Sequence, residues 1–117
     1  MLKFYGYKQC STCRKAEKAL EKSGRRYEFV DITETPPSAA SLKRMVSQSG
    51  ADLRKFFNTS GVQYRELKIK DKAAGMTEAQ ILSLLAGNGR LLKRPLVTDG
   101  DKSTVGFDEK AFTQTWK

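Results

Sequence analysis

Two cysteines, Cys10 and Cys13, carry most of the chemistry that this sequence offers. They are separated by two residues, and the chain of 117 residues contains no histidine. A Ser-His-Asp triad and a histidine-ligated metal are therefore excluded within the chain. Two cysteines also do not complete a four-ligand zinc site. Three interpretations of the pair remain, namely a redox site, half of a metal site shared with a partner, and two small buried residues.

The surroundings of the pair favour the redox interpretation. Residues 2–7 alternate like a strand, residues 11–23 carry a helical apolar stripe, and residues 27–32 have the pattern of a second strand. Cys10 therefore lies at a helix N-terminus, where free amides and the positive end of the helix dipole stabilise a thiolate. Cys13 lies one turn further in and is expected to be more buried and less acidic. We predict that Cys10 is the nucleophile and Cys13 the resolving thiol.

A nearby cation is expected to help Cys10. A thiol with a pKa of about 8.5 is only about 3% thiolate at pH 7, and lowering that pKa by about 2 units makes it about three-quarters thiolate. This needs about 2.7 kcal/mol of preferential stabilisation, whereas a helix terminus supplies at most about 2 kcal/mol. The candidates are Lys8, Arg14 and Arg94. For Arg14, a solvated position on the helix surface is an equally good interpretation.

The Arg94-Pro95 pair immediately precedes a short apolar strand, residues 96–98. Proline donates no hydrogen bond to a sheet, so it is typical of the first position of a strand. The bond before it can be cis at a cost of only about 0.5–1 kcal/mol. A cis bond would let Pro95 present backbone to a partner near the cysteines. An ordinary proline at a strand entry is the alternative.

The rest of the chain is predicted to form several helices and one β-hairpin. Capping and apolar spacing predict helices from Ser38 or Ser41 to Gly50 and from Thr77 to Gly87, a helical turn over 53–57, and a terminal helix around 111–116. Residues 64–67 are ambiguous. Strands 96–98 and 103–107 flank an Asp-Gly turn and are therefore antiparallel. The first two strands are joined through a helix and are therefore parallel. The sequence thus predicts an α/β fold with a mixed sheet.

The net charge of +9 invites a nucleic-acid interpretation. However, no stretch has more than two adjacent basic residues and no DNA-binding or RNA-binding motif is present, so sequence-specific nucleic-acid binding is not predicted. A solvated basic surface that attracts anionic partners is the alternative. No apolar run reaches the ~18 residues of a membrane span, and the first residues do not resemble a signal peptide. We expect a monomeric cytoplasmic protein without a bound metal or cofactor.

Several motifs together resemble the ArsC/Spx family. They follow one another in the family's order over nearly the whole chain: Cys10–Ala16, Phe57–Gly61, Tyr64–Leu67, Leu92–Val97 and Val105–Phe107. The resemblance implies one domain, residues 1–117, with a thioredoxin-like fold and a mixed four-stranded sheet. Residues 1–34 and 93–117 would form the thioredoxin-like part. Residues 35–92 would form an insertion whose helices begin at about residue 38. Pro95 would be the cis proline beside the active site.

The family contains two functional branches. In its arsenate reductases, a cysteine that matches Cys10 attacks the arsenic while three arginines hold the oxyanion. Only Arg94 matches one of these arginines, because Asn58 and Gly106 stand at the other two positions. Arg14, Lys55 and Lys93 are candidates to replace the missing charge. In the Spx branch, a Cys-x-x-Cys pair is a thiol switch in regulators that bind the C-terminal domain of the RNA polymerase α subunit.

We therefore predict an arsenate reductase-like thiol–disulfide oxidoreductase. Cys10 would attack a small oxyanion or a disulfide, and Cys13 would displace the product and leave a Cys10–Cys13 disulfide. An external thiol reductant, either thioredoxin or glutathione with glutaredoxin, would reset the pair. The residues expected to hold the anion are Thr12, Arg14, Asn58 and Arg94. The alternative is an Spx-like redox-sensing transcriptional regulator that binds RNA polymerase α.

Overall fold

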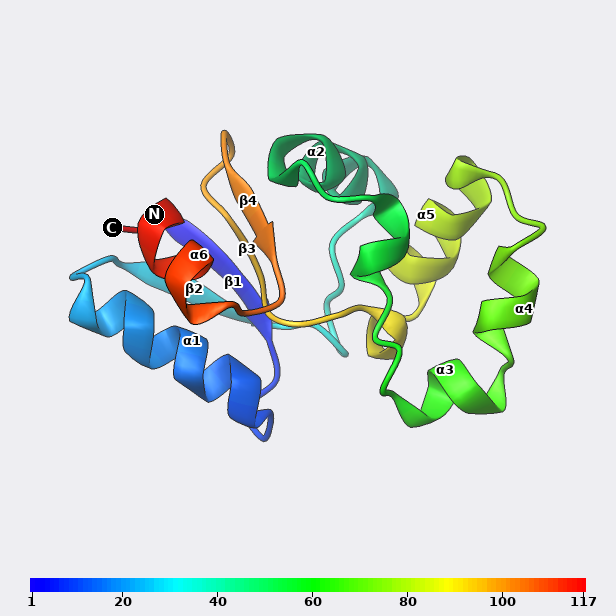
Figure 1. Cartoon of the computed structure of the whole chain (residues 1–117), viewed down its shortest axis with the longest axis horizontal. Helices are drawn as coiled ribbons and strands as arrows, with labels where there is room; N and C mark the ends of the chain where they lie inside the picture. The colour runs from blue at the N-terminus through cyan, green and yellow to red at the C-terminus, as the bar shows by residue number, and fades with distance from the viewer.

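A computed structural model describes all residues, 1–117, as two lobes arranged side by side along an axis of 42 Å (Figure 1). One lobe contains the sheet with helices α1 (Ser11–Lys22) and α6 (Glu109–Thr115). The other contains α3 (Val62–Glu66), α4 (Ile69–Ala73) and α5 (Glu78–Gly87), with α2 (Ala39–Ser49) between them and the sheet. This arrangement places the two cysteines, at the start of α1, in the sheet lobe.

The sheet has four strands in the order β2 (Tyr27–Asp31), β1 (Leu2–Gly6), β3 (Leu96–Thr98) and β4 (Ser103–Val105). β1 pairs with β2 in parallel and with β3 antiparallel, and β3 pairs with β4 antiparallel. The prediction of a mixed four-stranded sheet is confirmed. Because β3 runs opposite to β1, the residues after β1 and the residues before β3 lie at the same end of the sheet. That end receives both Cys10 and Arg94.

The caps predicted from the sequence form locally. Ser38 caps α2, which ends at Gly50 with a φ of 70°, and Thr77 and Gln80 form a reciprocal capping box at α5. The ambiguous segment 64–67 falls mostly within α3. Helix α4 consists of five residues with two lysines and only two apolar side chains, Ile69 and Ala73, which are too few to predict a helix from the sequence. No helix has the combination of length and apolar character that crossing a membrane requires.

Two hydrophobic cores lie on opposite faces of the sheet. Leu2, Phe4 and Val97 face α1 and α6, where they pack with Trp116, which is only 1% exposed. The indole Nε1–H of Trp116 donates to Thr104 Oγ1 at 3.0 Å, so its polar atom is satisfied. The side chains that face α2 and α5 form the larger core. Cys13 belongs to the first core, so the resolving thiol of the prediction sits in apolar surroundings.

Backbone hydrogen bonds tie residues 56–58 to residues 91–93, where the helical segment 35–92 meets the sheet lobe. Two short 3-10 helices, Leu53–Phe56 and Gly89–Leu91, bring distant residues together at this junction. The Lys93 amide donates to the Phe56 carbonyl and the Asn58 amide donates to the Leu91 carbonyl, both at 2.7 Å. These hydrogen bonds fix the backbone immediately before β3, and therefore the positions of Arg94 and Pro95.

Candidate active site

Cys10 is the N-cap residue of α1. Its backbone is extended (φ −84°, ψ 118°) and its Sγ accepts a hydrogen bond from the Cys13 amide at 3.3 Å. This is the position that serine, threonine, asparagine and aspartate usually occupy, because their side-chain oxygens satisfy free amides at a helix start. A sulfur there accepts the same bond best as a thiolate, and Cys10 is partly exposed. The side chain is therefore both activated and accessible.

The pKa of the Cys10 thiol is lowered by its surroundings. Partial burial raises this pKa, but hydrogen bonds from the Cys13 side chain and amide, the charge of Arg94 and the Thr12 amide together outweigh it. Arg94 is thus the cation that acts on Cys10. Of the other two candidates, Lys8 stacks on Phe29 with its Nζ 4.1 Å from the ring centroid, and Arg14 is exposed on α1.

Cys13 has the opposite character. Its side chain is 0% exposed, and burial raises the pKa of its thiol to about 12, an effect that the neighbouring Cys10 reinforces. The Cys13 side chain lies beside Cys10 Sγ and helps to lower the pKa of Cys10. The two sulfurs are therefore neighbours with different properties: Cys10 is partly exposed and has a lowered pKa, whereas Cys13 is buried and has a raised pKa.

Gly6 makes room for Cys13 and was not singled out from the sequence. A Cβ atom at this position would lie 2.6 Å from Phe4 Cε1 and 3.2 Å from Cys13 Sγ. A side chain at the last residue of β1 would therefore displace the Phe4 ring and press against Cys13 Sγ. The only sequence signal was a glycine ending an otherwise bulky strand, which is too weak to interpret alone. Tyr7 was also missed, and the Arg94 guanidinium lies 5.5 Å from its ring centroid.

The peptide bond between Arg94 and Pro95 is cis, the isomer that the family resemblance implied. Pro95 is buried, and its carbonyl accepts a hydrogen bond from the Gly106 amide at 2.9 Å. This bond extends the β3–β4 pairing by one step towards the cysteine end of the sheet. Pro95 and Arg94 are thereby anchored at the site.

The remaining predicted anion-binding residues lie in different places. The backbone amide of Thr12 faces Cys10 and helps to lower the pKa of its thiol. The Asn58 side chain lies beside Gly61, with its Nδ2 2.8 Å from where a Gly61 Cβ would stand. The structure therefore joins Thr12 and Arg94 to Cys10. The roles of Asn58 and Arg14 in holding an anion remain predictions.

Lys93 occupies the space that a side chain at position 106 would need. Gly106 has a φ of 74°, and a Cβ there would lie 2.9 Å from Lys93 Cε and 3.6 Å from Lys93 Nζ. Lys93 also lines a groove of about 590 Å³ together with Lys55, between the end of α2, β4 and α6. Two of the three cations considered as replacements for the missing arginines thus lie together. Neither cysteine lines this groove.

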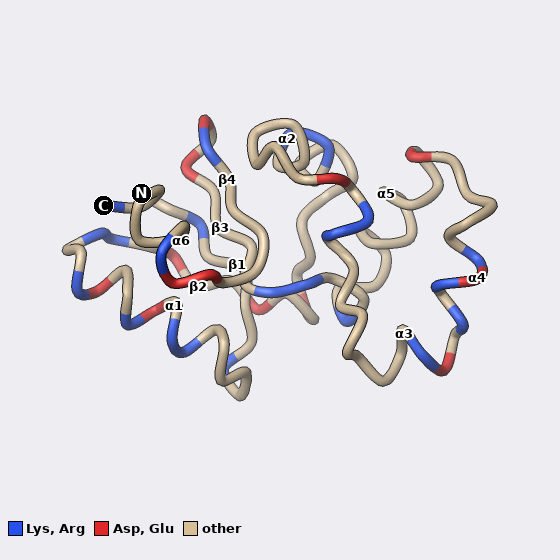
Figure 2. The backbone as a smooth tube through the Cα atoms, in the orientation of Figure 1, with Lys and Arg blue, Asp and Glu red and all other residues tan.

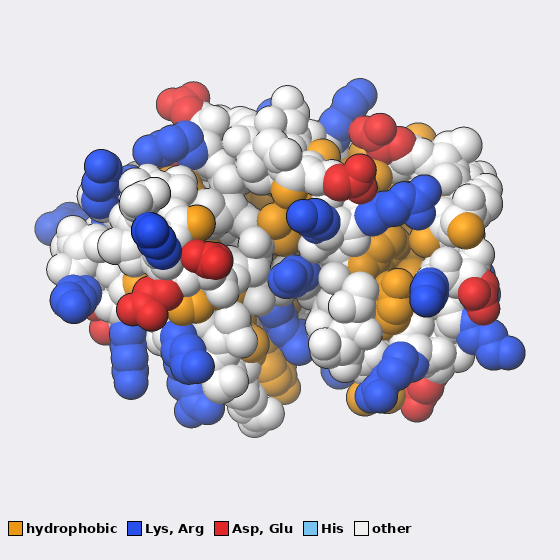
Figure 3. All heavy atoms as spheres, viewed as in Figure 1, with side chains coloured by type: hydrophobic (Ala, Val, Ile, Leu, Met, Phe, Trp, Pro, Cys, Tyr) orange, Lys and Arg blue, Asp and Glu red, His pale blue; other side chains and the backbone are white.

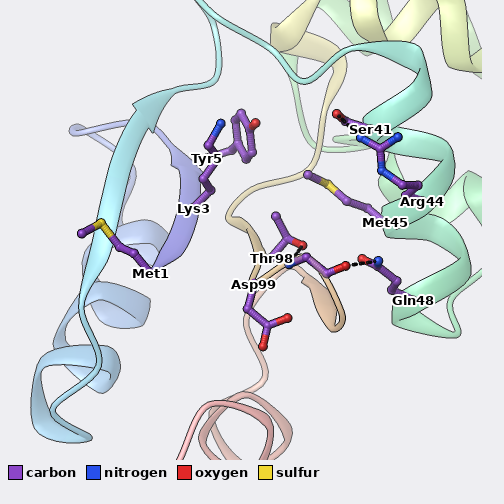
Figure 4. A pocket seen from close by; sticks show the side chains of 10 residues that line it. Met1, Lys3, Tyr5, Ser41, Arg44, Met45, Gln48, Thr98 and Asp99 are labelled. Atoms are coloured by element: carbon purple, nitrogen blue, oxygen red, sulfur yellow. Dashed lines mark hydrogen bonds between the residues drawn. The ribbon is translucent and has the colours of Figure 1, made fainter.

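A smaller hollow of about 300 Å³ lies on the α2 side of the sheet (Figure 4). Lys3 and Tyr5 of β1 face Arg44 and Met45 of α2 across it. Neither cysteine contributes to this hollow, so it is separate from the thiol site. Elsewhere, no three cysteine, aspartate or glutamate side chains gather in a group able to hold a metal ion.

The pH dependence of Cys10 reactivity is expected to follow Arg94. Because Arg94 lowers the pKa of Cys10, replacing it with glutamine should move the midpoint of Cys10 alkylation by iodoacetamide to higher pH. The exposed Arg14 offers a matched control, and Arg14→Gln should leave the midpoint where it is. Alkylation rates from pH 5 to pH 10, measured by mass spectrometry, check this prediction. Equal shifts in both variants would show that overall charge, rather than Arg94, sets the pKa.

Comparisons with known proteins agree with this architecture. An uncharacterized Bacillus subtilis protein, YusI, is 53% identical over 115 residues, which cover 98% of each chain. An ArsC family related protein from Bacteroides fragilis has a solved structure that superposes with a TM-score of 0.93 at 41% identity, covering 99% of this chain and 97% of that one. The global transcriptional regulator Spx of Streptococcus mutans is 25% identical, covering 86% of this chain and 72% of the regulator.

The resemblance seen in the sequence motifs is confirmed by a family model. That model, described as the ArsC family, matches residues 5–115. The match includes Cys10, Cys13, Arg94 and Pro95. It covers the helical segment and most of the two stretches of chain, before and after that segment, that form the sheet lobe. This chain belongs to the ArsC family.

Proposed function

We propose that the protein is a thiol–disulfide oxidoreductase in which Cys10 is the nucleophile and Cys13 the resolving thiol. One observation carries the proposal, namely that Cys10 Sγ caps α1 and accepts a hydrogen bond from the Cys13 amide while the Cys13 side chain beside it is fully buried. An accessible thiolate next to a protonated thiol is the arrangement that two-step thiol exchange requires.

The proposed reaction on a disulfide substrate has two steps. Cys10 thiolate attacks one substrate sulfur, forms a mixed disulfide and releases the other sulfur as a thiolate. Cys13 then loses its proton and attacks Cys10 Sγ, which releases the second substrate thiolate and leaves a Cys10–Cys13 disulfide. Two electrons pass from the cysteines to the substrate. The low pKa of Cys10 also makes its thiolate a good leaving group in the last step of reduction, when the second thiol of an external dithiol resolves the mixed disulfide on Cys10.

The same two thiols can supply the two electrons that reduce arsenate to arsenite. Cys10 sulfur displaces one oxygen of arsenate, which leaves as water, and forms a sulfur–arsenic bond. Attack of Cys13 on Cys10 Sγ then breaks that bond, and the arsenic departs as arsenite with two electrons. Arg94 and the amides at the start of α1 are the donors available to the oxyanion. Parallel assays with thioredoxin and with glutathione plus glutaredoxin, each with arsenate and with a disulfide, identify the substrate class and the reductant.

An Spx-like regulator is the second candidate, supported by the similarity to the Spx regulator and by the same pair of thiols. In that function the Cys10–Cys13 disulfide would be the signal rather than a catalytic intermediate. Its partner would be the C-terminal domain of the RNA polymerase α subunit. A pull-down with that domain, using oxidised and reduced protein, separates the candidates. Redox-dependent binding without substrate turnover supports the regulator.

Replacing Cys13 with serine is expected to trap the first step. Cys10 should still attack a disulfide substrate, but no thiol would remain to release it, so one substrate thiol should stay covalently bound. Intact mass spectrometry measures the adduct, and turnover with thioredoxin as sole reductant should be lost. Because a serine hydroxyl is costly in the buried position of Cys13, Cys13→Ala is a matched second variant. Full turnover in either variant would rule out the resolving role.

A further inference from the structure

Helix α1 has two surfaces of opposite charge. On the side towards β2, the carboxylates of Glu17 and Glu21 both accept from the Tyr27 hydroxyl, at 3.0 and 3.3 Å. Lys15, Lys18 and Lys22 follow one another at helical spacing on a different side, and all three are exposed. The hydrogen bonds to Tyr27 hold these two carboxylates on the side towards β2, while the three lysines occupy a different side of the helix.

The three lysines line a shallow cleft of about 540 Å³ between α1 and α6, which we call the lysine cleft. Its far wall consists of Phe107, Thr113 and Glu109, so it contains three cations, one carboxylate and one aromatic ring. Alternating basic and acidic residues mark α1 in the backbone view (Figure 2), and in the space-filling view basic side chains gather along the edge of the molecule formed by α1 (Figure 3). The cleft thus offers positive charge beside a small apolar surface.

The lysine cleft begins close to Cys10. At about 1.5 Å of rise per residue, Lys15, Lys18 and Lys22 lie about 8, 12 and 18 Å along the helix axis from Cys10. A transient redox interface buries up to about 600 Å² on each partner, which corresponds to a disc of up to about 14 Å radius. A protein whose cysteine reaches Cys10 Sγ therefore covers Lys15 and Lys18 if it approaches along α1. A small thiol would not.

The proposed function supplies the reason for such an approach, and this inference rests on it. We propose that the lysine cleft docks the acidic surface of a protein dithiol that reduces the Cys10–Cys13 disulfide. One thiolate of that partner attacks Cys10 Sγ, and Cys13 leaves and takes up a proton. The second thiol of the partner then attacks the mixed disulfide and releases Cys10 thiolate, so the partner becomes a disulfide and supplies both electrons. Complementary charge accelerates encounter and orients the partner.

Charge reversal tests the docking proposal. The protein is oxidised to its Cys10–Cys13 disulfide, and its reduction is followed with an acidic thioredoxin and, separately, with dithiothreitol, which is small and carries no charge other than that of its attacking thiolate. Lys15→Glu, Lys18→Glu and Lys22→Glu together should slow reduction by thioredoxin at least about tenfold at low salt. Reduction by dithiothreitol should stay within about twofold. Raising salt from about 0.01 to about 0.1 M should slow only the thioredoxin reaction of the wild type, because screening shortens from about 30 to about 10 Å.

A matched variant controls for overall charge. Lys43→Glu, Lys70→Glu and Lys72→Glu make the same change in net charge on α2 and α4, away from α1. This variant should react with thioredoxin at close to the wild-type rate. An equal loss in both variants, or no loss in the cleft variant, overturns the proposal. If the triple cleft variant does not fold, Lys15→Glu with Lys18→Glu replaces it. A wild-type protein that forms no Cys10–Cys13 disulfide overturns the proposed function, and the docking proposal with it.

Discussion

Replacement of Cys10 with serine is expected to reduce multiple-turnover disulfide reduction by at least about 10³-fold. A serine hydroxyl is not ionised near neutral pH, so the variant has no thiolate to begin the exchange, and Cys13 is too buried and too weakly acidic to replace it. Steady-state reduction of a model disulfide with thioredoxin as reductant measures the loss. The adduct that Cys13→Ser traps should be absent in Cys10→Ser.

The same variant separates chemistry from structure. Cys10 caps α1, and serine is a favoured N-cap residue whose oxygen can accept the Cys13 amide. The free energy of unfolding should therefore remain within about 1 kcal/mol of the wild type, as measured by urea denaturation. Substantial activity in Cys10→Ser would assign the nucleophile elsewhere. A strong loss of stability would show that the thiol has a structural role that the cap geometry does not explain.

Replacement of Gly89 with alanine is expected to lower the free energy of unfolding by about 3 kcal/mol. Gly89 begins the second 3-10 helix, and a Cβ there would overlap the carbonyl oxygen of Ile32 and lie 2.8 Å from the Ile32 carbonyl carbon. Both clashing atoms are backbone, so no side-chain rotation relieves them. The two segments must separate, and that loosens the junction between the helical segment and the sheet lobe. Urea denaturation measures the change.

Gly87 provides the matched control for Gly89. It is the last residue of α5, and a Cβ there meets nothing within 4 Å. Gly87→Ala should leave stability unchanged or raise it by up to about 1 kcal/mol, because alanine is the better helix former. Comparable destabilisation in both variants would mean that a general effect of replacing glycine, and not the contact with Ile32, is responsible.

The parts of the fold that the sequence predicted well are those with local signals. The strand, turn and helix around Cys10, the capping box at Thr77 and the hairpin at residues 96–105 each depend on residues close together in the chain. The second hairpin strand ends at Val105, two residues earlier than predicted, because Gly106 leaves the extended conformation with a φ of 74°. Segment 62–73 was harder, because two five-residue helices carry too few apolar positions to show a period. Its helices form against neighbours that come from elsewhere in the chain.

The sequence by itself determined that Cys10 stands at a helix start, since alternation, turn and helical spacing are all encoded within the first thirty residues. Which cation faces that cysteine was decided only by tertiary structure. β3 pairs antiparallel with β1 and brings Arg94 to Cys10, while Lys8, although nearer in sequence, lies over Phe29. The need for a glycine at position 6, where a side chain would crowd Phe4 and Cys13, likewise depends on how β1 packs against α1. Contacts of this kind join residues whose local patterns are independent, so no local pattern predicts them.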